Sequence, residues 1–240
     1  MVAALAFVAT AVSTVFAQAT LVRWSQSRQP HQRAWAIALA QFAMAAAMLV
    51  VGSTTGWNQQ VYRVFFLLGA VLNVPWLALG TVYLLAGTKW GQRIERGLWV
   101  LTGVAIGVLT SAPMHAELIR KDRVPDGKVV FGVFPRVLAA VGSSVGALVV
   151  LVGTVYSIVR FARNRSRTDS GISAGRMIGA NLCIAVGTMI LGSTGALKGV
   201  AGGKDQGFVL GLALGISVIY AGFVLAAPRN ARRTTLPANV

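Results

Sequence analysis

The chain has 240 residues, of which 55% are hydrophobic and only 12% are charged, and its mean hydropathy is +0.68. A soluble globular domain carries about 25% charged residues. The charge is also one-sided, with 22 Lys and Arg against 6 Asp and Glu, formally +16. Because the basic residues fall between long apolar runs, this composition excludes a soluble domain, a disordered tail and a nucleic-acid binder. The single cysteine, Cys183, excludes an intramolecular disulfide.

Seven apolar runs of roughly 20 residues, each without a charged residue, follow one another along the chain. A run of this length crosses the hydrocarbon core of a bilayer as a helix, and the runs lack the alternation of barrel strands. They predict an all-α membrane protein with one seven-helix domain, 1–227, and a short basic cytoplasmic tail, 228–240. The predicted spans are 2–22, 34–52, 64–87, 97–113, 137–159, 177–197 and 207–227.

The orientation of these spans follows from the loops. Fourteen of the Lys and Arg residues lie on one side and eight on the other, and the acids divide so that the net charges are +12 and +4. The more basic side is cytoplasmic, which places the N-terminus outside and the C-terminus inside. Val15-Phe16-Ala17 resembles a signal-peptide cleavage site. However, the charged n-region is missing and cleavage would reverse the charge rule, so we interpret the first run as a span.

The third predicted span carries its small, polar and aromatic residues on one stripe. They recur every three or four residues, which is the spacing of one helix face. Pro75 lacks a backbone donor and predicts a kink near Asn73. The stripe consists of Tyr62, Phe66, Gly69, Asn73, Trp76, Gly80, Tyr83 and Gly87.

Two interpretations of this stripe stay open. In the first, Asn73 and Trp76 form the floor of a mid-membrane pocket, and the amides of Gln41 and Asn181 reach it from the second and sixth spans. In the second, the third span is a central packing helix with a polar clamp, since small residues allow close helix contacts and a buried amide bonds across them. The candidate ligand-binding residues are therefore Gln41, Asn73, Trp76 and Asn181.

Several chemistries lack the residues that they need. No predicted span contains Asp, Glu, His, Lys or Arg, which argues against a proton pump, a retinal protein and a b-type haem protein. His31 and His115 fall on opposite sides, so they cannot share a metal ion. The sequence at 142–146 matches the G-x-S-x-G nucleophile pattern, but within an apolar helix it indicates packing. We therefore expect no catalytic residue, metal or cofactor.

The outer loop 114–135 is the longest loop, and Pro125-Asp126-Gly127 marks a turn in it. We expect 117–123 and 128–134 to pair as a hairpin over the bundle, as a ligand gate or as a solvated cap. On the other side, clustered arginines predict contact with anionic lipid headgroups, although an acidic protein could also dock there. They are Arg160, Arg163, Arg165, Arg167, Arg229, Arg232 and Arg233.

The stretch 63–93, RVFFLLGAVLNVPWLALGTVYLLAGTKWGQR, resembles the corresponding part of uncharacterised seven-helix membrane proteins of actinobacteria. That family has no assigned activity, so the resemblance implies none for this chain. The span containing Trp35 and the following span with its central Pro75 are more loosely similar to the seven-helix N-terminal sensor module of bacterial histidine kinases. Because the sequence given ends 13 residues after the last predicted span, we expect no attached kinase domain.

These observations lead to two functional hypotheses. The first is a non-enzymatic accessory or sensor-like module of the bacterial cytoplasmic membrane, which packs against itself or a protein partner. The second is a carrier for a neutral or lipophilic small molecule. An enzyme acting on lipid at the interface ranks third, because the sequence offers no convergent set of titratable residues. The bacterial location agrees with 17 arginines against 5 lysines, a bias of GC-rich genomes.

Overall fold

The computed structural model describes residues 1–163, 174–201 and 204–226, and most of them are helical. Apart from one antiparallel bridge between Met114 and Phe131, this part of the chain contains no strand. The tail 228–240 lies outside the described residues. The elements in chain order are α1 (Val2–Ser27), α2 (Pro30–Thr55), α3 (Gln59–Phe65), the π-helix η1 (Phe66–Leu72), α4 (Asn73–Ser111), the 3₁₀ turn η2 (Ala116–Leu118), α5 (Gly127–Val130), α6 (Val133–Arg163), α7 (Ala174–Ala201) and α8 (Asp205–Leu225).

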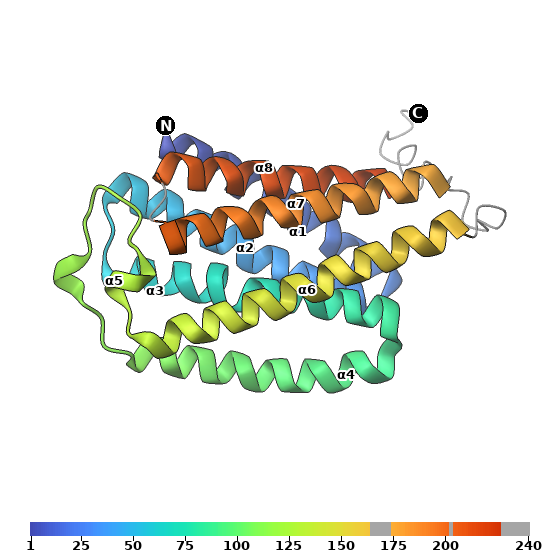
Figure 1. Ribbon diagram of the computed structural model, residues 1–240, viewed down its shortest axis with the longest axis horizontal. Helices are drawn as coiled ribbons and strands as arrows, with labels where there is room; N and C mark the ends of the chain where they lie inside the picture. The colour runs from blue at the N-terminus through green and yellow to red at the C-terminus, as the bar shows by residue number, and fades with distance from the viewer. Residues whose placement is uncertain (164–173, 202–203, 227–240) are drawn as a thin grey trace, which may run out of the picture.

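Within the described residues, six helical stretches are long and apolar enough to cross a membrane, which confirms an all-α protein of multi-pass membrane type. They run along one common axis, and Met1 and the end of α8 lie at opposite ends of the bundle (Figure 1). Helix α1 packs on α2 and α8, α4 packs on α2 and α6, and α7 packs between α6 and α8. We call the end with Met1 and residues 112–132 the capped end, and the end with Gly87 the basic end.

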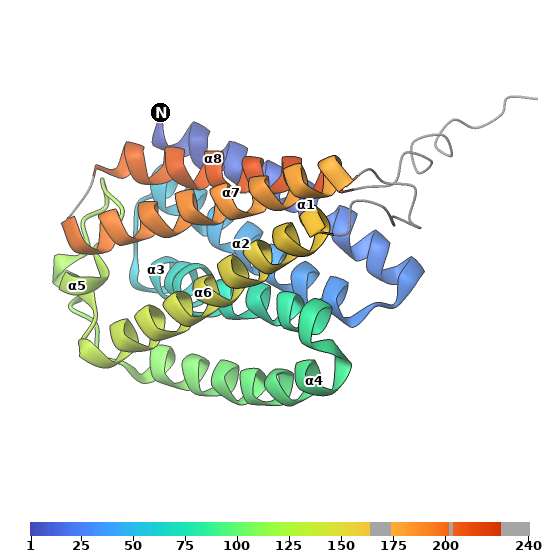
Figure 2. The same cartoon turned by 45° about the vertical axis from the view of Figure 1, so that its right-hand side comes forward.

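Helix α4 reverses its direction at Gly87. The apolar stretch that includes it runs for 53 residues, from Gln59 to Ser111. As a straight helix it would measure about 80 Å, more than twice the hydrocarbon core. Gly87 interrupts it with φ 81° and ψ 176°, and the chain turns back beside itself (Figures 1 and 2). We call residues 73–86 the inner limb of α4 and residues 88–111 its outer limb.

Just before Pro75, where the sequence predicts a kink, the helix contains a π-helical stretch. Residues 66–72 adopt π-helical geometry, which is rare and leaves backbone carbonyls without their usual helical donors. One of these carbonyls is satisfied from α6, because the Ser143 hydroxyl donates to the Ala70 oxygen at 2.6 Å. The distorted turn is therefore stabilised by a neighbouring helix, as a broken helix in an apolar environment requires.

Glycines mark the places where helices touch. A Cβ on Gly69 would lie 3.2 Å from the Ala45 side chain, and one on Gly80 would lie 2.1 Å from the Trp35 ring. At these two glycines the predicted stripe meets α2. Elsewhere, Gly146 meets the backbone of Val74, and Gly187 on α7 meets the backbone of α8. Each contact places two helix backbones closer than a larger side chain would allow.

The loop between α4 and α6 closes the capped end. Val124, Val130 and Phe131 are buried there, and Phe131 stacks on Tyr62 with ring centroids 5.6 Å apart. Asp205 at the start of α8 accepts a bond from the Val124 amide at 2.9 Å and pairs with Lys198. The two arms meet at the Met114–Phe131 bridge, so the expected pairing of 117–123 with 128–134 is wrong: 127–130 forms a helical turn instead, which begins at the Asp126 cap. In this structure the loop is a packed cap.

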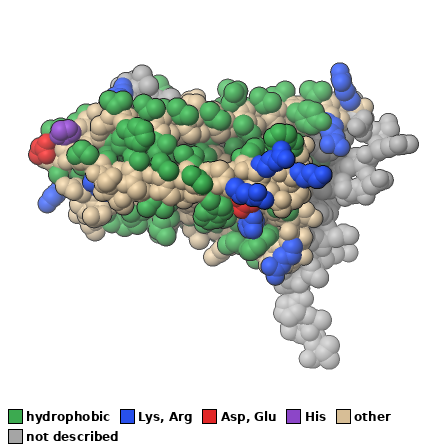
Figure 3. Space-filling model, turned by 90° about the horizontal axis from the view of Figure 1, so that it is seen from below, with side chains coloured by type: hydrophobic (Ala, Val, Ile, Leu, Met, Phe, Trp, Pro, Cys, Tyr) green, Lys and Arg blue, Asp and Glu red, His purple; other side chains and the backbone are tan. Residues whose placement is uncertain are grey.

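The surface agrees with a membrane environment. Many large apolar side chains on the outside of the helices are more than half exposed, including Leu148 and Val152 of α6. Figure 3 shows hydrophobic and uncharged side chains across the middle of one face, while Lys and Arg side chains gather near the basic end. This pattern of an apolar band between polar ends matches the layers of a bilayer.

Candidate functional site

A half-open cavity of about 100 Å³ lies inside the bundle, in the half nearer the basic end. All six long helical stretches contribute to it, but the outer limb of α4 does not. Most of its lining is apolar, with a few hydroxyl groups and one amide. The lining residues are Phe16, Thr20, Trp35, Leu39, Leu77, Thr81, Leu84, Leu85, Val150, Gly153, Thr154, Ser157, Asn181, Ile184, Ile219 and Phe223.

The polar groups of this cavity are largely satisfied by their own helices. The hydroxyl of Thr20 donates to the Phe16 carbonyl at 2.9 Å, and that of Thr154 donates to the Val150 carbonyl at 2.8 Å. The Asn181 amide nitrogen donates to the Met177 carbonyl at 2.9 Å. Because these donors are already engaged, the cavity favours an apolar occupant over a strongly polar one.

One wall of the cavity depends on a close contact between α2 and α4. The Trp35 ring lies directly on Gly80, where any side chain would overlap it. On the opposite side, Thr81 and Leu85 pack against Gly153 of α6 in the same way. Glycine at these two positions lets the inner limb of α4 lie between α2 and α6, which shapes the space that remains.

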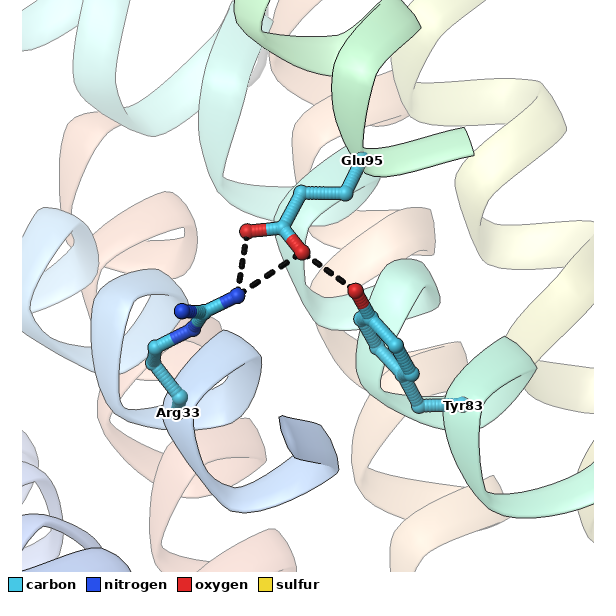
Figure 4. Close-up of polar contacts among 3 residues, drawn as sticks. All are labelled: Arg33, Tyr83 and Glu95. Carbon is cyan, nitrogen blue, oxygen red and sulfur yellow. Dashed lines mark hydrogen bonds and ion pairs between the residues drawn. The ribbon is translucent and has the colours of Figure 1, made fainter. Parts of the chain in front are cut away.

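Beside the cavity, three polar residues join α2 to both limbs of α4 (Figure 4). Arg33 at the start of α2 donates to both carboxylate oxygens of Glu95, at 2.6 and 2.8 Å. The hydroxyl of Tyr83 donates to the same carboxylate from the inner limb. The Glu95 side chain is only 13% exposed and the Arg33 side chain is 42% exposed, so the acid is buried more deeply than its cation. This cluster fixes the basic end of the α4 hairpin.

Two further polar contacts hold the outer limb along its length. Near the middle, the Trp76 indole donates to the Thr102 hydroxyl at 3.3 Å, and Trp76 meets Trp99 edge-on. At the capped end, Arg63 donates to the carbonyls of Leu109, Thr110 and Ala112. These carbonyls belong to the end of the helix, where a cation is favourable. The hairpin is thus tied at three levels.

Two amides near the middle of the bundle each have an unsatisfied atom. Among the described residues, the buried Gln41 Oε1 and Asn73 Nδ2 find no hydrogen-bond partner. Helix α2 runs antiparallel to η1 and the inner limb of α4, with Ala45 at Gly69 of η1 and Trp35 at Gly80 of α4. Gln41 lies one turn from Ala45 and Asn73 one turn from Gly69, so the two residues are at the same level on facing helices. One atom is an acceptor and the other is a donor.

The four candidate ligand-binding residues therefore occupy different places. Asn181 lines the cavity, whereas Gln41, Asn73 and Trp76 are not among its lining residues. Asn73 is 7% exposed, and Trp76 is 1% exposed with its indole bonded to Thr102. The structure brings Gln41 and Asn73 to one level but places Trp76 toward the outer limb. Binding at these four residues stays a prediction.

Sequence reasoning missed Glu95, which it treated as part of a charged loop. The structure continues α4 through this segment, so Glu95 points inward from a helix. A signal was present: Glu95 shares a regular helical spacing with buried residues, which predicts an inward-facing stripe. The stripe comprises Gly91, Glu95, Leu98, Thr102, Ala105 and Leu109.

The remaining sequence motifs have structural places. The G-x-S-x-G segment lies within α6, where Gly146 packs on Val74 and Ser143 bonds to Ala70. Among the described residues, no group of three His, Cys, Asp or Glu side chains could hold a metal ion. Arg160 and Arg163 are exposed at the end of α6. The other clustered arginines lie outside the described residues: Arg165, Arg167, Arg229, Arg232 and Arg233.

Comparison of the chain with models of known protein families found no match, and comparison with curated protein sequences found none either.

Proposed function

We propose that the chain is a protein of the bacterial cytoplasmic membrane with seven membrane-spanning segments, its N-terminus outside and its C-terminus inside. The reversal at Gly87 supports the count, because residues 59–86 before it and residues 88–111 after it are each long enough to cross the hydrocarbon core. The orientation rests on the distribution of basic residues. Lys89, Arg93 and Arg96 follow the reversal at the basic end, which is the cytoplasmic end in this proposal.

Within this frame, the chain acts as a non-enzymatic, sensor-like membrane module that responds to a small apolar molecule in the central cavity. The observation that carries this proposal is the cavity itself, because all six long helical stretches line it. An occupant would contact all of them at once and so change the relative stability of alternative packings. A ligand acts as a signal only through such a difference in affinity between two states.

The size and lining of the cavity define the class of ligand. A volume of about 100 Å³ is somewhat smaller than an engineered apolar cavity of about 150 Å³ that binds benzene. It therefore suits a short alkyl chain or a small ring, and its open side can admit part of a larger lipophilic molecule. The capped end is closed by the packed loop, so access from the half nearer the basic end is favoured.

Photolabelling tests this proposal without knowledge of the natural ligand. A small alkyl diazirine is added to the purified protein in neutral detergent, and the labelled peptides are mapped after irradiation. We expect labels on Leu77, Thr81 and Val150. Ser157→Leu fills the cavity and should remove these labels, whereas Ser144→Leu, at an exposed site on the same helix, should not. Labelling that is confined to outward-facing residues in all three proteins would contradict the proposal.

The unsatisfied amides favour a second candidate function, a carrier for a neutral small molecule. Gln41 and Asn73 lie between the cavity and the capped end, where a passing solute would need hydrogen-bond partners. Asn73→Leu should then abolish the thermal stabilisation that a transported solute gives, while the protein still folds. The sensor proposal, in contrast, predicts that cavity labelling survives this substitution.

The module could also work through a protein partner or a second copy of itself. Affinity purification in mild detergent, followed by identification of everything that co-elutes, separates these versions. A stoichiometric protein supports an accessory subunit, and a retained small molecule supports the sensor or the carrier.

A further inference from the structure

The outer limb of α4 begins with three cations on one face. Lys89, Arg93 and Arg96 are spaced by four and three residues, so they project from the same side of the helix. All three side chains are exposed. We call these three residues the basic face of α4.

Within the described part of the chain, no acidic side chain neutralises the basic face. Glu95 is the acid of this segment, and it points inward to Arg33 and Tyr83. Among the described residues, no salt bridge reaches Lys89, Arg93 or Arg96. Lys89 also lies in the first turn of the outer limb, where the helix dipole prefers negative charge. An external anion would relieve both effects.

The level of the basic face along the outer limb points to the headgroup layer. Residues 97–111 of this limb carry no charge, and they are preceded by nine residues, 88–96, that extend about 13 Å. The whole limb is about 36 Å long, somewhat longer than the hydrocarbon core, so its first turn projects beyond that core. The long side chains of Arg93 and Arg96, one and two turns further in, extend outward to the same layer of phospholipid phosphates.

Exposed tryptophans flank the basic face. Trp90 is 58% exposed on one side and packs against the Arg93 guanidinium at 5.2 Å, and Trp99 is 55% exposed on the other side. Tryptophan concentrates at the membrane–water interface, because its ring is apolar and its N–H is polar. A docking surface for a soluble acidic protein does not require exposed tryptophans. A lipid, in contrast, contacts the cations through its charged headgroup and the tryptophans through its apolar part.

We propose that the basic face of α4 binds the headgroup of an anionic phospholipid in the leaflet at the basic end. Arg93 and Arg96 present planar donor groups that match phosphate oxygens, and Lys89 adds a third positive charge. The lipid chains then lie deeper along the outer limb, beside Val100 and Val104, which are both exposed. This site differs from the arginine cluster that ends α6. It rests on the proposed membrane placement but not on the ligand in the cavity.

Lipid binding by the purified protein tests this site. Native mass spectrometry and thermal unfolding in neutral detergent are recorded with added phosphatidylglycerol, phosphatidylcholine or inorganic phosphate. We expect phosphatidylglycerol to be retained and to stabilise the protein more than phosphatidylcholine does. The triple variant Lys89→Gln, Arg93→Gln, Arg96→Gln should weaken this binding by about fivefold for each cation removed.

A matched triple variant at the capped end serves as the control. Arg120→Gln, Lys121→Gln and Arg123→Gln change the net charge equally, at three exposed positions, and should leave phosphatidylglycerol binding within about twofold of the parent. Equal losses in both triple variants would overturn the site, because binding would then follow net charge alone. No loss in either would overturn it too. Equal stabilisation by inorganic phosphate would show a site for free anions and not for lipid.

The result is independent of the cavity. Diazirine labelling of the cavity should be unchanged in the Lys89, Arg93, Arg96 variant. Loss of lipid binding with intact cavity labelling supports the headgroup site, whereas failure of cavity labelling with intact lipid binding rejects only the sensor proposal.

Discussion

Glu95 is a partly buried acid in a chain that has only six acidic residues. It is accommodated because two elements supply its partners: Arg33 provides the opposite charge, and Tyr83 provides a hydroxyl donor. A carboxylate in such a place would be strongly unfavourable without them. Gly80 plays a different role, since its missing side chain lets the Trp35 ring lie on the α4 backbone. One polar cluster and one steric contact therefore define the region around the cavity.

The Arg33–Glu95 pair should contribute measurably to stability. In a double-mutant cycle with Arg33→Gln and Glu95→Gln, we expect a coupling free energy of about 1 kcal/mol, near the upper end for partly exposed pairs. Thermal or denaturant unfolding in detergent measures it. The control cycle uses Arg120 and Asp122, whose side chains are 63% and 64% exposed, and should give a smaller value. Additive effects at Arg33 and Glu95 would contradict the structure.

Gly80→Ala tests the contact with Trp35. Its new Cβ would overlap the indole ring, which must move, and such overpacking costs about 1–3 kcal/mol of unfolding free energy. Gly103→Ala is the matched control, because nothing lies within 4 Å of a Cβ there. We expect the control to keep or slightly raise the unfolding temperature. If both variants unfold at the same temperature, the close approach of α2 and α4 is not present.

At the scale of elements, the α4 hairpin is the feature that organises the bundle. Its inner limb packs between α2 and α6. Its outer limb is held by hydrogen bonds at three levels: Arg63 bonds to the end of the limb, and Thr102 and Glu95 of the limb bond to side chains of the inner limb. The turn between the limbs needs only one residue with a non-helical conformation, Gly87. The π-helix before Pro75 leaves backbone carbonyls without their usual helical donors, and the Ser143 hydroxyl of α6 satisfies one of them.

Gly87→Ala tests the turn. The backbone there has φ 81° and ψ 176°, a region that residues other than glycine rarely enter, at about 1–3 kcal/mol. Because nothing lies within 4 Å of the added Cβ, any loss of stability is a backbone effect. Gly97→Ala, at an equally open position within the outer limb, should cause no loss. Equal unfolding temperatures of the two variants would show that residue 87 does not need this conformation.

At the scale of the whole molecule, the long helices and the inward stripe of the inner limb could be predicted from the sequence. The stripe with Gly69 and Gly80 predicted a face of close helix contact, and α2 packs at both glycines. Pro75 predicted a kink, and the structure has a π-helix just before it. The site was less accessible to sequence reasoning. Arg33 and Glu95 are 62 positions apart, and charge counting placed both in loops. The cavity arises from the packing of all six long stretches, which no local pattern encodes.

The most direct test of the account is the side of the membrane on which the Gly87 turn lies. In a Cys183→Ala background, single cysteines replace Thr88 near the turn and Asp122 in the cap, and intact bacterial cells are treated with a membrane-impermeant maleimide. The account predicts that the cysteine at 122 is labelled in intact cells, whereas the cysteine at 88 is labelled only after permeabilisation. Labelling of both cysteines in intact cells would place the turn and the cap on the same side, and would contradict the seven-span arrangement.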